Sequence, residues 1–555
     1  METMTKKLAF PAVCVLLLGL CAVPLFAQRT VQVMSNAVWS DPVKADTSAP
    51  LRSYPAAPLT VSPRAHAPLK PKGQQLKASG TAGGQAFGAP VGRLGPTVGL
   101  SFDGISIDPG APSTENCANI IGGQLAPPDT NLAVGDTQVV QWVNICYAVY
   151  DKATGNLIAG PFAGNQFWAG FGGVCQINND GDIIIQWDKA NHVWVASQNV
   201  FGPFTTCIAV SKTNDATGAF NRFQFSQPGF PDYHKFGLAP HAYYQTQNDF
   251  GTGSAYVGVN VCAYDADGLR SGSKRSKQVC FLDNSNGTLF DDSMLPADTD
   301  QDPPTAGPAP EVLLGSIDNS NPGSNVYQYV FTVAFKGKGK ATLAGVNGSL
   351  PISVPSYSLG CGGFGACIQQ PTTANGTPEP LDALGDRLMY RLALFDDGTN
   401  QHFLVNHSVN DTAGAVGARW YEFTAPTGST SLSLAQSGQT PADGEYRWMG
   451  SVARDTFGDI ALGYSRSSAT TGDFPSIYVS GQTAGEPAGT TDTEVLVKAG
   501  GGSQFATADR WGDYSSMALD GADHCTFWYT TEYYPFDGSF QWYTHINSLK
   551  FPSCP

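Results

Sequence analysis

The stretch Arg510-Trp511-Gly512-Asp513-Tyr514-Ser515-Ser516-Met517-Ala518-Leu519-Asp520 predicts the first strand of a β-hairpin. A charged start leads into a short apolar run, and Asp520-Gly521 is a typical tight-turn pair. The chain returns through residues 525–532, whose aromatic and β-branched side chains favour a strand. We therefore expect two antiparallel strands joined by a turn.

The same pattern occurs twice upstream. Residues 447–465 contain RWMGSVA, a turn and IALGYS, and residues 386–405 contain DRLMYRL, the turn DDG and HFLV. Successive copies lie roughly 60 residues apart, and hairpins repeated at such a period indicate a radial array. We predict an all-β fold, a seven-bladed β-propeller, with six or eight blades as the alternatives.

Composition supports this prediction and excludes some functions. The 555 residues are 42% hydrophobic but only 14% charged, and 63 glycines and 38 prolines supply many turns. The formal net charge of −15 argues against a nucleic-acid partner, because binding polyphosphate requires a clustered cationic surface. It also disfavours adhesion to anionic lipid.

The N-terminus predicts export. Lys6 and Lys7 precede an apolar core at 13–20 that is too short to cross a bilayer, and Ala27 offers a cleavage point. Cys21 raises a lipoprotein alternative, although Leu20 before it is larger than such a site favours. We expect a signal peptide at 1–27, a location that is secreted, periplasmic or at the cell surface, and no membrane insertion after signal removal.

The mature chain is expected to have two parts. Residues 28–97 are rich in Pro, Ala, Ser and Gly and predict a disordered leader, with a cleavable pro-segment as the alternative. Residues 98–555 are expected to form the propeller. Its units are predicted to begin near residues 127, 180, 231, 311, 384, 446 and 509.

Three details of the body follow from the pattern. A short strand near Val98–Phe102 is expected to complete the last blade and close the ring, which removes exposed sheet edges. The Asp/Pro-rich residues 298–310 are expected to form a loop. Residues 348–380 are expected to be a long insertion.

Ten cysteines remain after the expected signal, and an even number in an exported chain predicts disulfides. Pairing of nearest neighbours is the economical hypothesis, with Cys361 and Cys367 closing a glycine-rich loop. A metal–thiolate site is disfavoured, because there is no CxxC motif and no clustered His. The ten residues are Cys117, Cys146, Cys175, Cys207, Cys262, Cys280, Cys361, Cys367, Cys525 and Cys554.

Several motifs together resemble a family of exported bacterial β-propellers whose architecture is similar to that of sialidase/BNR-type propellers. They are PPDTN at 127–131, DYHK at 232–235, GDRLMYR at 385–391, RWMGS at 447–451 and RWGDY at 510–514. The resemblance covers residues 98 to 554. It implies the fold but no activity, because no intact Asp-box of the form Ser-x-Asp-x-Gly-x-Thr-Trp is present.

Cations recur at the starts of the units. Arg387, Arg447 and Arg510 occupy matching positions, and three guanidiniums converging on a central channel would grip the carboxylate or sulfate of an acidic sugar. Lys235 is a further ligand-binding candidate. The favoured interpretation is structural: each Arg packs on a neighbouring Trp and pairs with a nearby Asp, which fastens one blade to the next.

Carboxylates recur there as well. Asp129, Asp182 and Asp386 are metal candidates, because facing carboxylates repel unless a cation, a proton or an Arg intervenes, and Ca²⁺ prefers oxygen ligands. The alternative is that each Asp accepts hydrogen bonds from turn amides.

Hydrolysis of a glycan would require two carboxyl groups flanking the bond, or a Tyr nucleophile beside a Glu. Asp232, Asp513, Tyr514 and Glu532 are the candidates by residue type. Two functions follow. The leading hypothesis is an extracellular binding or scaffold module for a glycan or a protein partner. The alternative is a sialidase-like hydrolase or lyase that acts on acidic sugars.

Overall fold

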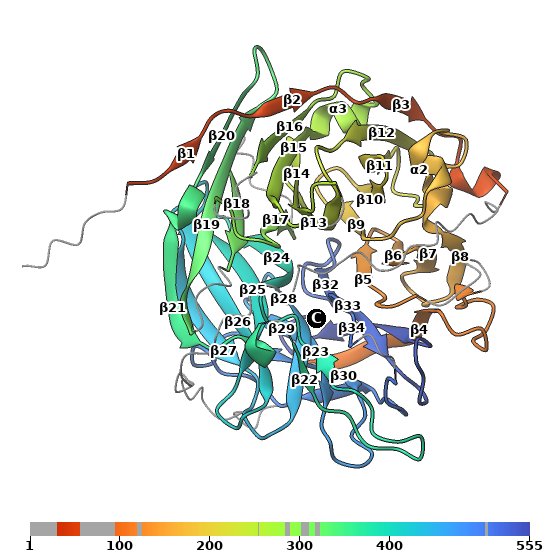
Figure 1. Cartoon of the computed structure of the whole chain (residues 1–555), viewed down its shortest axis with the longest axis vertical. Helices are drawn as coiled ribbons and strands as arrows, with labels where there is room; N and C mark the ends of the chain where they lie inside the picture. The colour runs from red at the N-terminus through yellow and green to blue at the C-terminus, as the bar shows by residue number, and fades with distance from the viewer. Residues whose placement is uncertain are drawn as a thin grey trace, which may run out of the picture. The chain divides into compact units, whose positions relative to one another are not determined.

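β-Strands make up almost all of the regular structure (Figure 1). The helices are short, as in α2 (Val174–Ile177) and α3 (Ala266–Ser271). No helix among the described residues has the length and apolar character to span a bilayer. This computed structural model describes residues 30–55, 95–118, 125–252, 255–283, 289–300, 310–316, 322–363, 365–505 and 509–555.

Three antiparallel sheets follow one another along the chain. The first has the order β5 (Thr130–Val134), β6 (Gln138–Val143), β7 (Cys146–Asp151) and β8 (Leu157–Ala163). The second is β9 (Ile183–Asp188), β10 (Val193–Phe201), β11 (Phe204–Ser211), β12 (Phe220–Ser226) and β3 (Lys44–Thr47). The third is β13 (Pro231–Leu238), β14 (Ala242–Asp249), β15 (Gly258–Asp265), β16 (Gln278–Leu282) and β2 (Val38–Ser40).

The next two groups of strands are joined into one sheet. One group is β17 (Leu295–Thr299), β18 (Glu311–Gly315), β19 (Gly323–Ala334), β20 (Lys340–Ala344) and β1 (Val33–Met34), with β21 (Pro351–Tyr357) also on β19. The other is β24 (Met389–Asp396), β25 (Asn400–Asn410), β26 (Val416–Pro426) and β27 (Ser433–Gln439). The joint is a parallel pairing of β17 with β24, in which Ala297 lies opposite Leu392.

The last two sheets complete the body. One is β28 (Tyr446–Arg454), β29 (Ile460–Ser467), β30 (Ser476–Gln482) and β31 (Val495–Lys498). The other is β32 (Ser516–Leu519), β33 (Phe527–Tyr533), β34 (Tyr543–Lys550) and β4 (Thr97–Ser106). Because β4 pairs antiparallel with β34, the predicted closing strand is confirmed.

The first strands of these groups form a closed ring, which is the defining feature of a β-propeller. β5, β9, β13, β17, β24, β28 and β32 contact one another in this order, and β32 contacts β5 again. Figure 1 shows the remaining strands of each group lying outward from the ring. All residues of β9 are buried, as expected for an inner strand packed on both faces, whereas the outer strand β27 alternates between exposed and less exposed positions.

Side chains link successive inner strands. The Asn131 Oδ1 atom accepts a hydrogen bond from the Ile185 backbone N–H at 2.6 Å. The Ser451 Oγ atom accepts one from the Met517 N–H at 3.0 Å. Each bond satisfies a buried backbone donor that its own sheet leaves unpaired at that position, so the ring is held by polar contacts as well as by apolar packing.

The disulfides follow the nearest-neighbour hypothesis. The bonded pairs are Cys117–Cys146, Cys175–Cys207, Cys262–Cys280, Cys361–Cys367 and Cys525–Cys554. The last pair ties the β32–β33 loop to the C-terminus, as predicted.

The N-terminal segment differs from the sequence prediction. Within the expected disordered leader, β1, β2 and β3 are ordered because each adds an antiparallel edge strand to a different sheet, on β20, β16 and β12. We call residues 33–47 the strap. The predicted signal peptide at 1–27 and the leader residues 56–94 lie outside the described residues.

Two further boundaries also differ. The fourth unit begins at β17, before its predicted start at residue 311, and part of the predicted loop 298–310 belongs to this inner strand. The proline within Leu295–Thr299 and the aspartates after it concealed the strand signal. The predicted insertion 348–380 contains β21 and the short β22 (Ala366–Ile368), so it is not a continuous loop.

Candidate functional site

The inner strands begin with a repeated backbone conformation. Asp129, Asp182, Tyr233, Met449 and Asp513 all have positive φ, between 45° and 57°. A non-glycine residue in this region costs about 1–2 kcal/mol, and Asp tolerates it better than most because its side chain can bond locally. This costly conformation thus recurs near the start of several inner strands, at residues of three different types.

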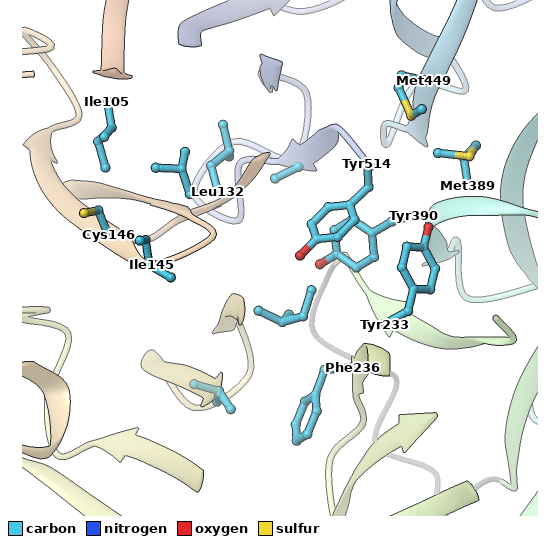
Figure 2. Close-up of a cluster of buried hydrophobic side chains, with 14 of the residues drawn as sticks. Ile105, Leu132, Ile145, Cys146, Tyr233, Phe236, Met389, Tyr390, Met449 and Tyr514 are labelled. Atoms are coloured by element: carbon cyan, nitrogen blue, oxygen red, sulfur yellow. The ribbon is translucent and has the colours of Figure 1, made fainter. Parts of the chain in front are cut away.

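Aromatic rings fill the centre that the sequence predicted to be a channel. Figure 2 shows Tyr233, Tyr390 and Tyr514 grouped beside Met389 and Met449, all five of them buried. The ring centroids of Tyr233 and Tyr514 are 6.0 Å apart, and those of Tyr390 and Tyr514 are 5.7 Å apart. Two of the hydroxyls are used internally: Tyr233 donates to the Asp513 carbonyl at 3.3 Å and Tyr514 to the Ile183 carbonyl at 3.2 Å.

Lys235 lies within this aromatic group. Its Nζ atom is 3.4 Å from the centroid of the Tyr233 ring and 4.1 Å from that of Tyr514, and it donates to the His234 carbonyl at 3.1 Å. Burial, which is partly offset by nearby carboxylates including Asp182, lowers the pKa of Lys235 to about 7. The ammonium group is therefore held by ring faces and one carbonyl.

Two of the three predicted arginines lie beside the three tyrosines and Lys235, and both are already paired. We call these tyrosines, Lys235, the two arginines and the aspartates beside them the central group. Arg387 donates to both oxygens of Asp386 at 2.9 Å, and its guanidinium carbon lies 4.5 Å from the Tyr233 ring. Arg510 donates through Nε to Asp513 at 2.8 Å, and its Nη2 contacts the second oxygen of that carboxylate. Both pairs are bidentate and side-on, so the Nε and Nη2 donors of each guanidinium are already committed to a carboxylate of this chain.

Arg447 does not join them. Its guanidinium is fully buried and pairs with Glu494 at 2.5 Å and with Asp443 at 2.8 Å, both outside the central group. The predicted trio of converging arginines is therefore a pair. Of the favoured structural interpretation, the pairing with Asp is observed, as Arg387–Asp386 and Arg510–Asp513, but each pair lies within one segment of the chain. The neighbouring Trp448 and Trp511 pack on each other at 5.8 Å.

Three further carboxyl groups surround the cations. Asp182 accepts a hydrogen bond from the Tyr233 N–H at 2.8 Å, and Asn144 lies 3.5 Å from the Asp129 carboxylate. Burial and the charge of Asp182 raise the pKa of Asp232 to about 8, and the same two causes raise the pKa of Asp129 well above its ordinary value. These groups keep protons at a pH where exposed aspartates have lost them.

The remaining catalytic candidates are internal. Glu532 accepts a hydrogen bond from the Gly512 N–H at 2.7 Å, and burial raises its pKa well above the ordinary value. Tyr514 is 1% exposed, and burial raises its pKa as well. A buried neutral tyrosine is a poor nucleophile because forming its phenolate would require an uncompensated buried charge.

The metal candidates do not gather around one point. Among the residues that the structure describes, the trio of potential ligand atoms lying within 4.8 Å of one another is Asp523, Cys525 and Cys554. Its two cysteines form a disulfide and have no thiolate to offer. Asp386 is committed to Arg387, so Asp129, Asp182 and Asp386 offer Ca²⁺ no ready set of oxygens.

Sequence reasoning missed two members of the central group. Tyr390 contacts Tyr514, and Asp382 accepts from the Leu384 N–H at 2.8 Å. Burial raises the pKa of Asp382 to about 7. Tyr390 lies within the quoted GDRLMYR motif, and Asp382 lies just before it. The repeated sequence therefore pointed to this part of the chain.

Comparisons with known proteins leave the activity unassigned. No protein-family model matches the chain, and no curated protein sequence matches it. Extracellular domains 1-2 of Drosophila Semaphorin 1b match at TM-score 0.34 and 6% identity, covering 77% of this chain and 86% of that one. A neuraminidase-like protein of A/little yellow-shouldered bat matches at TM-score 0.32 and 8% identity, covering 65% and 98%.

An alpha-L-arabinanase of Cellvibrio cellulosa matches at TM-score 0.25 and 10% identity, covering 56% of this chain and 94% of that one. The names of these proteins differ from one another, and likeness at this level assigns no function to the present chain.

Proposed function

We propose that this protein is an exported, seven-bladed β-propeller that acts as an extracellular binding module for a glycan or a protein partner. The closed ring of β5, β9, β13, β17, β24, β28 and β32 supports this blade number. Five disulfides among the described residues support an oxidising compartment. With Asp and Glu outnumbering Lys and Arg by 46 to 31, nucleic acid and anionic lipid are disfavoured partners.

One observation carries the choice of binding over catalysis. The charged groups at the ring centre satisfy one another: Arg387 with Asp386, Arg510 with Asp513, and Asp182 with a backbone amide. Each arginine–aspartate pair lies within one segment of the chain and fixes the side chains at the start of an inner strand. The side-on fork of each arginine is therefore occupied by a carboxylate of the protein, which supports binding over hydrolysis of an acidic sugar at the ring centre.

A second candidate function has one observation in its favour. A carboxyl group whose pKa is about 8, as in Asp232, carries a proton near neutral pH, which is the state that a general acid needs. Glycan hydrolysis would in addition need a second carboxyl across the bond.

The test compares binding with hydrolysis. The purified protein is applied to a glycan array and to immobilised extracellular proteins, and it is incubated separately with fluorogenic sialosides and uronides. We expect saturable retention on at least one ligand and no release of fluorophore. Release that is present in the wild type and lost in Asp232→Asn would establish the hydrolase instead, and absence of any retention would refute the binding module.

A further inference from the structure

A cavity of about 390 Å³ lies between two neighbouring sheets, away from the central group. Its walls come from β26, β27, the β28–β29 turn and the β30–β31 loop. Arg454, the last residue of β28, lines the cavity, whereas the central group lies at the starts of the inner strands. Polar and aromatic side chains line it, among them Glu422, Gln436, Arg454, Phe457, Gln482 and Glu486.

Glu422 is fixed before any ligand arrives. The side chain is nearly buried and accepts from His402 Nδ1 at 2.7 Å, Gln436 Nε2 at 2.7 Å and Arg454 Nη1 at 3.2 Å. Burial alone would raise the pKa of this carboxyl, but the hydrogen bond from His402 and the Arg454 charge outweigh it and hold the pKa below its usual value. Glu422 is therefore an ionised acceptor with a set orientation.

Arg454 has a donor to spare. Its Nη1 is shared between Glu422 and the Gly458 carbonyl, at 3.2 and 3.4 Å. Its Nε–H is buried and has no acceptor in the part of the chain that the structure describes. Gly458 leaves room for the guanidinium, because a Cβ there would lie 3.1 Å from Nη2. A buried N–H without a partner costs about 1–3 kcal/mol, so a movement of the side chain that brought Nε–H to an acceptor on a ligand would be favourable.

The side chain of Phe457 lies at the edge of the cavity. Phe457 is 47% exposed, although large apolar side chains are usually covered. Its turn is rigid, because the Asp455 carboxylate accepts from the N–H groups of Phe457 and Asp459, both at 2.9 Å. An exposed ring held in this way is a platform for the apolar face of a ligand.

The charges on the walls restrict the ligand. A carboxylate would be repelled by Glu422 and Glu486, and an ammonium group, which has no lone pair, would leave the Arg454 donors without an acceptor. A hydroxyl group can both accept from Arg454 and donate to a carboxylate oxygen of the wall. A cavity of this size falls in the range of small-molecule sites and holds about one or two sugar rings.

We propose that this cavity binds a neutral sugar unit, with its hydroxyls on Arg454 and the neighbouring carboxylates and one ring face on Phe457. The proposal does not depend on the central group or on the binding-module hypothesis. A ligand at this position would bridge the sheets that contain β26 and β30.

The test is calorimetric titration of the purified protein with methyl glycosides of glucose, galactose, mannose, arabinose and N-acetylglucosamine, and with glucuronic acid as the charged probe. We expect saturable binding of at least one neutral glycoside and no binding of glucuronic acid. Phe457→Ala should weaken that binding at least tenfold. Arg454→Lys, which keeps the charge but loses Nε–H, should do the same.

The matched control is Phe536→Ala, which removes an aromatic ring of similar exposure, 46%, outside the cavity. Its affinity should stay within twofold of the wild type. Absence of binding by every neutral glycoside, glucuronic acid binding as tight as the neutral sugars, or equal effects of the two Phe substitutions would each overturn the proposal. None of these outcomes bears on the hydrolysis assay with Asp232→Asn.

Discussion

At the scale of single residues, the ring centre contains several energetically unfavourable features that ordinary protein cores avoid. Asp129 and Asp513 combine left-handed backbone with burial, and Lys235 is an ammonium group enclosed by tyrosine rings. Each cost is balanced locally, by a bidentate arginine, a backbone amide or a retained proton. The members of the central polar network are therefore energetically coupled. Removing one of them leaves its partners buried without compensation.

A retained proton makes stability depend on pH. Asp232 has a pKa of about 8 in the folded protein against an ordinary value of 3.8, so its contribution is complete below pH 4 and is lost as pH rises through 8. We expect the free energy of unfolding of the wild type to fall more steeply between pH 5 and 7 than that of Asp232→Asn, by up to about 1.4 kcal/mol per pH unit.

Urea denaturation at pH 5, 6 and 7 measures both slopes. Staying below pH 7 limits interference from Lys235, whose lowered pKa of about 7 acts in the opposite direction: its contribution is present above its ordinary value of 10.5 and is lost as pH falls through 7. Parallel curves for the two proteins would show that Asp232 is ionised in the folded state.

The sequence predicted which residues lie at the starts of the inner strands, but not which way each side chain points. Repeated starts predicted that Asp182, Asp232 and Arg510 belong to matching positions, because equivalent strands of a repeat place equivalent residues alike. Whether a guanidinium faces the axis or its own sheet depends on a single torsion and on a partner far along the chain. Arg447 faces Glu494 for that reason, and no spacing in the sequence reports it.

At the scale of elements, the strap shows why composition wrongly predicted that residues 33–47 would be disordered. Its strands have two to four residues and little apolar periodicity, so they would not form a sheet alone. They are ordered because β12, β16 and β20 present unpaired edges to them. The buried Arg222 adds a specific anchor, because it donates to both oxygens of Asp46 at 2.9 and 2.7 Å.

The strap offers a matched pair of substitutions. Asp46 faces an arginine side chain that is 1% exposed, whereas Asp41 pairs with Lys277 where both side chains are largely exposed, at 68% and 44%. We expect Asp46→Ala to lower the free energy of unfolding by about 1–2 kcal/mol, and Asp41→Ala by less than about 0.5 kcal/mol. Chemical denaturation checks both, and equal losses would mean that the strap contributes only through its backbone.

At the scale of the whole molecule, the ring is closed by a strand from the other end of the chain. β4 covers the edge of β34, with Thr97 opposite Lys550 and Ser106 opposite Tyr543. An uncovered β34 would present unpaired N–H and C=O groups to other molecules. Closure thus protects the edge of β34 from pairing with strands of other molecules.

Two truncations separate the roles of the strap and the closing strand. A chain that starts at Gly95 lacks the strap but keeps β4, and we expect it to remain a folded monomer of reduced stability. A chain that starts at Ile107 also lacks β4 and should associate through β34. Size-exclusion chromatography with light scattering decides between these outcomes, and a monomer of the second chain would show that closure is dispensable.

The architecture was the most predictable level, since hairpin repeats and a lone N-terminal strand indicate a closed ring without any contact being known. The fourth unit was the exception. Pro296 and the aspartates that follow it resemble a loop, yet β17 pairs on both sides, with β18 and with β24. The parallel partner of this strand lies almost a hundred residues away, which no local pattern reports.

The strap and the closing strand have a consequence for the order of assembly. Val33 leaves the ribosome long before its partner Ala344, and Thr97 leaves it long before Lys550. The second of these pairings cannot form until the final hairpin has been made. The finished ring is therefore a product of the completed chain, and a polypeptide whose last strands have not yet been made has its ring open.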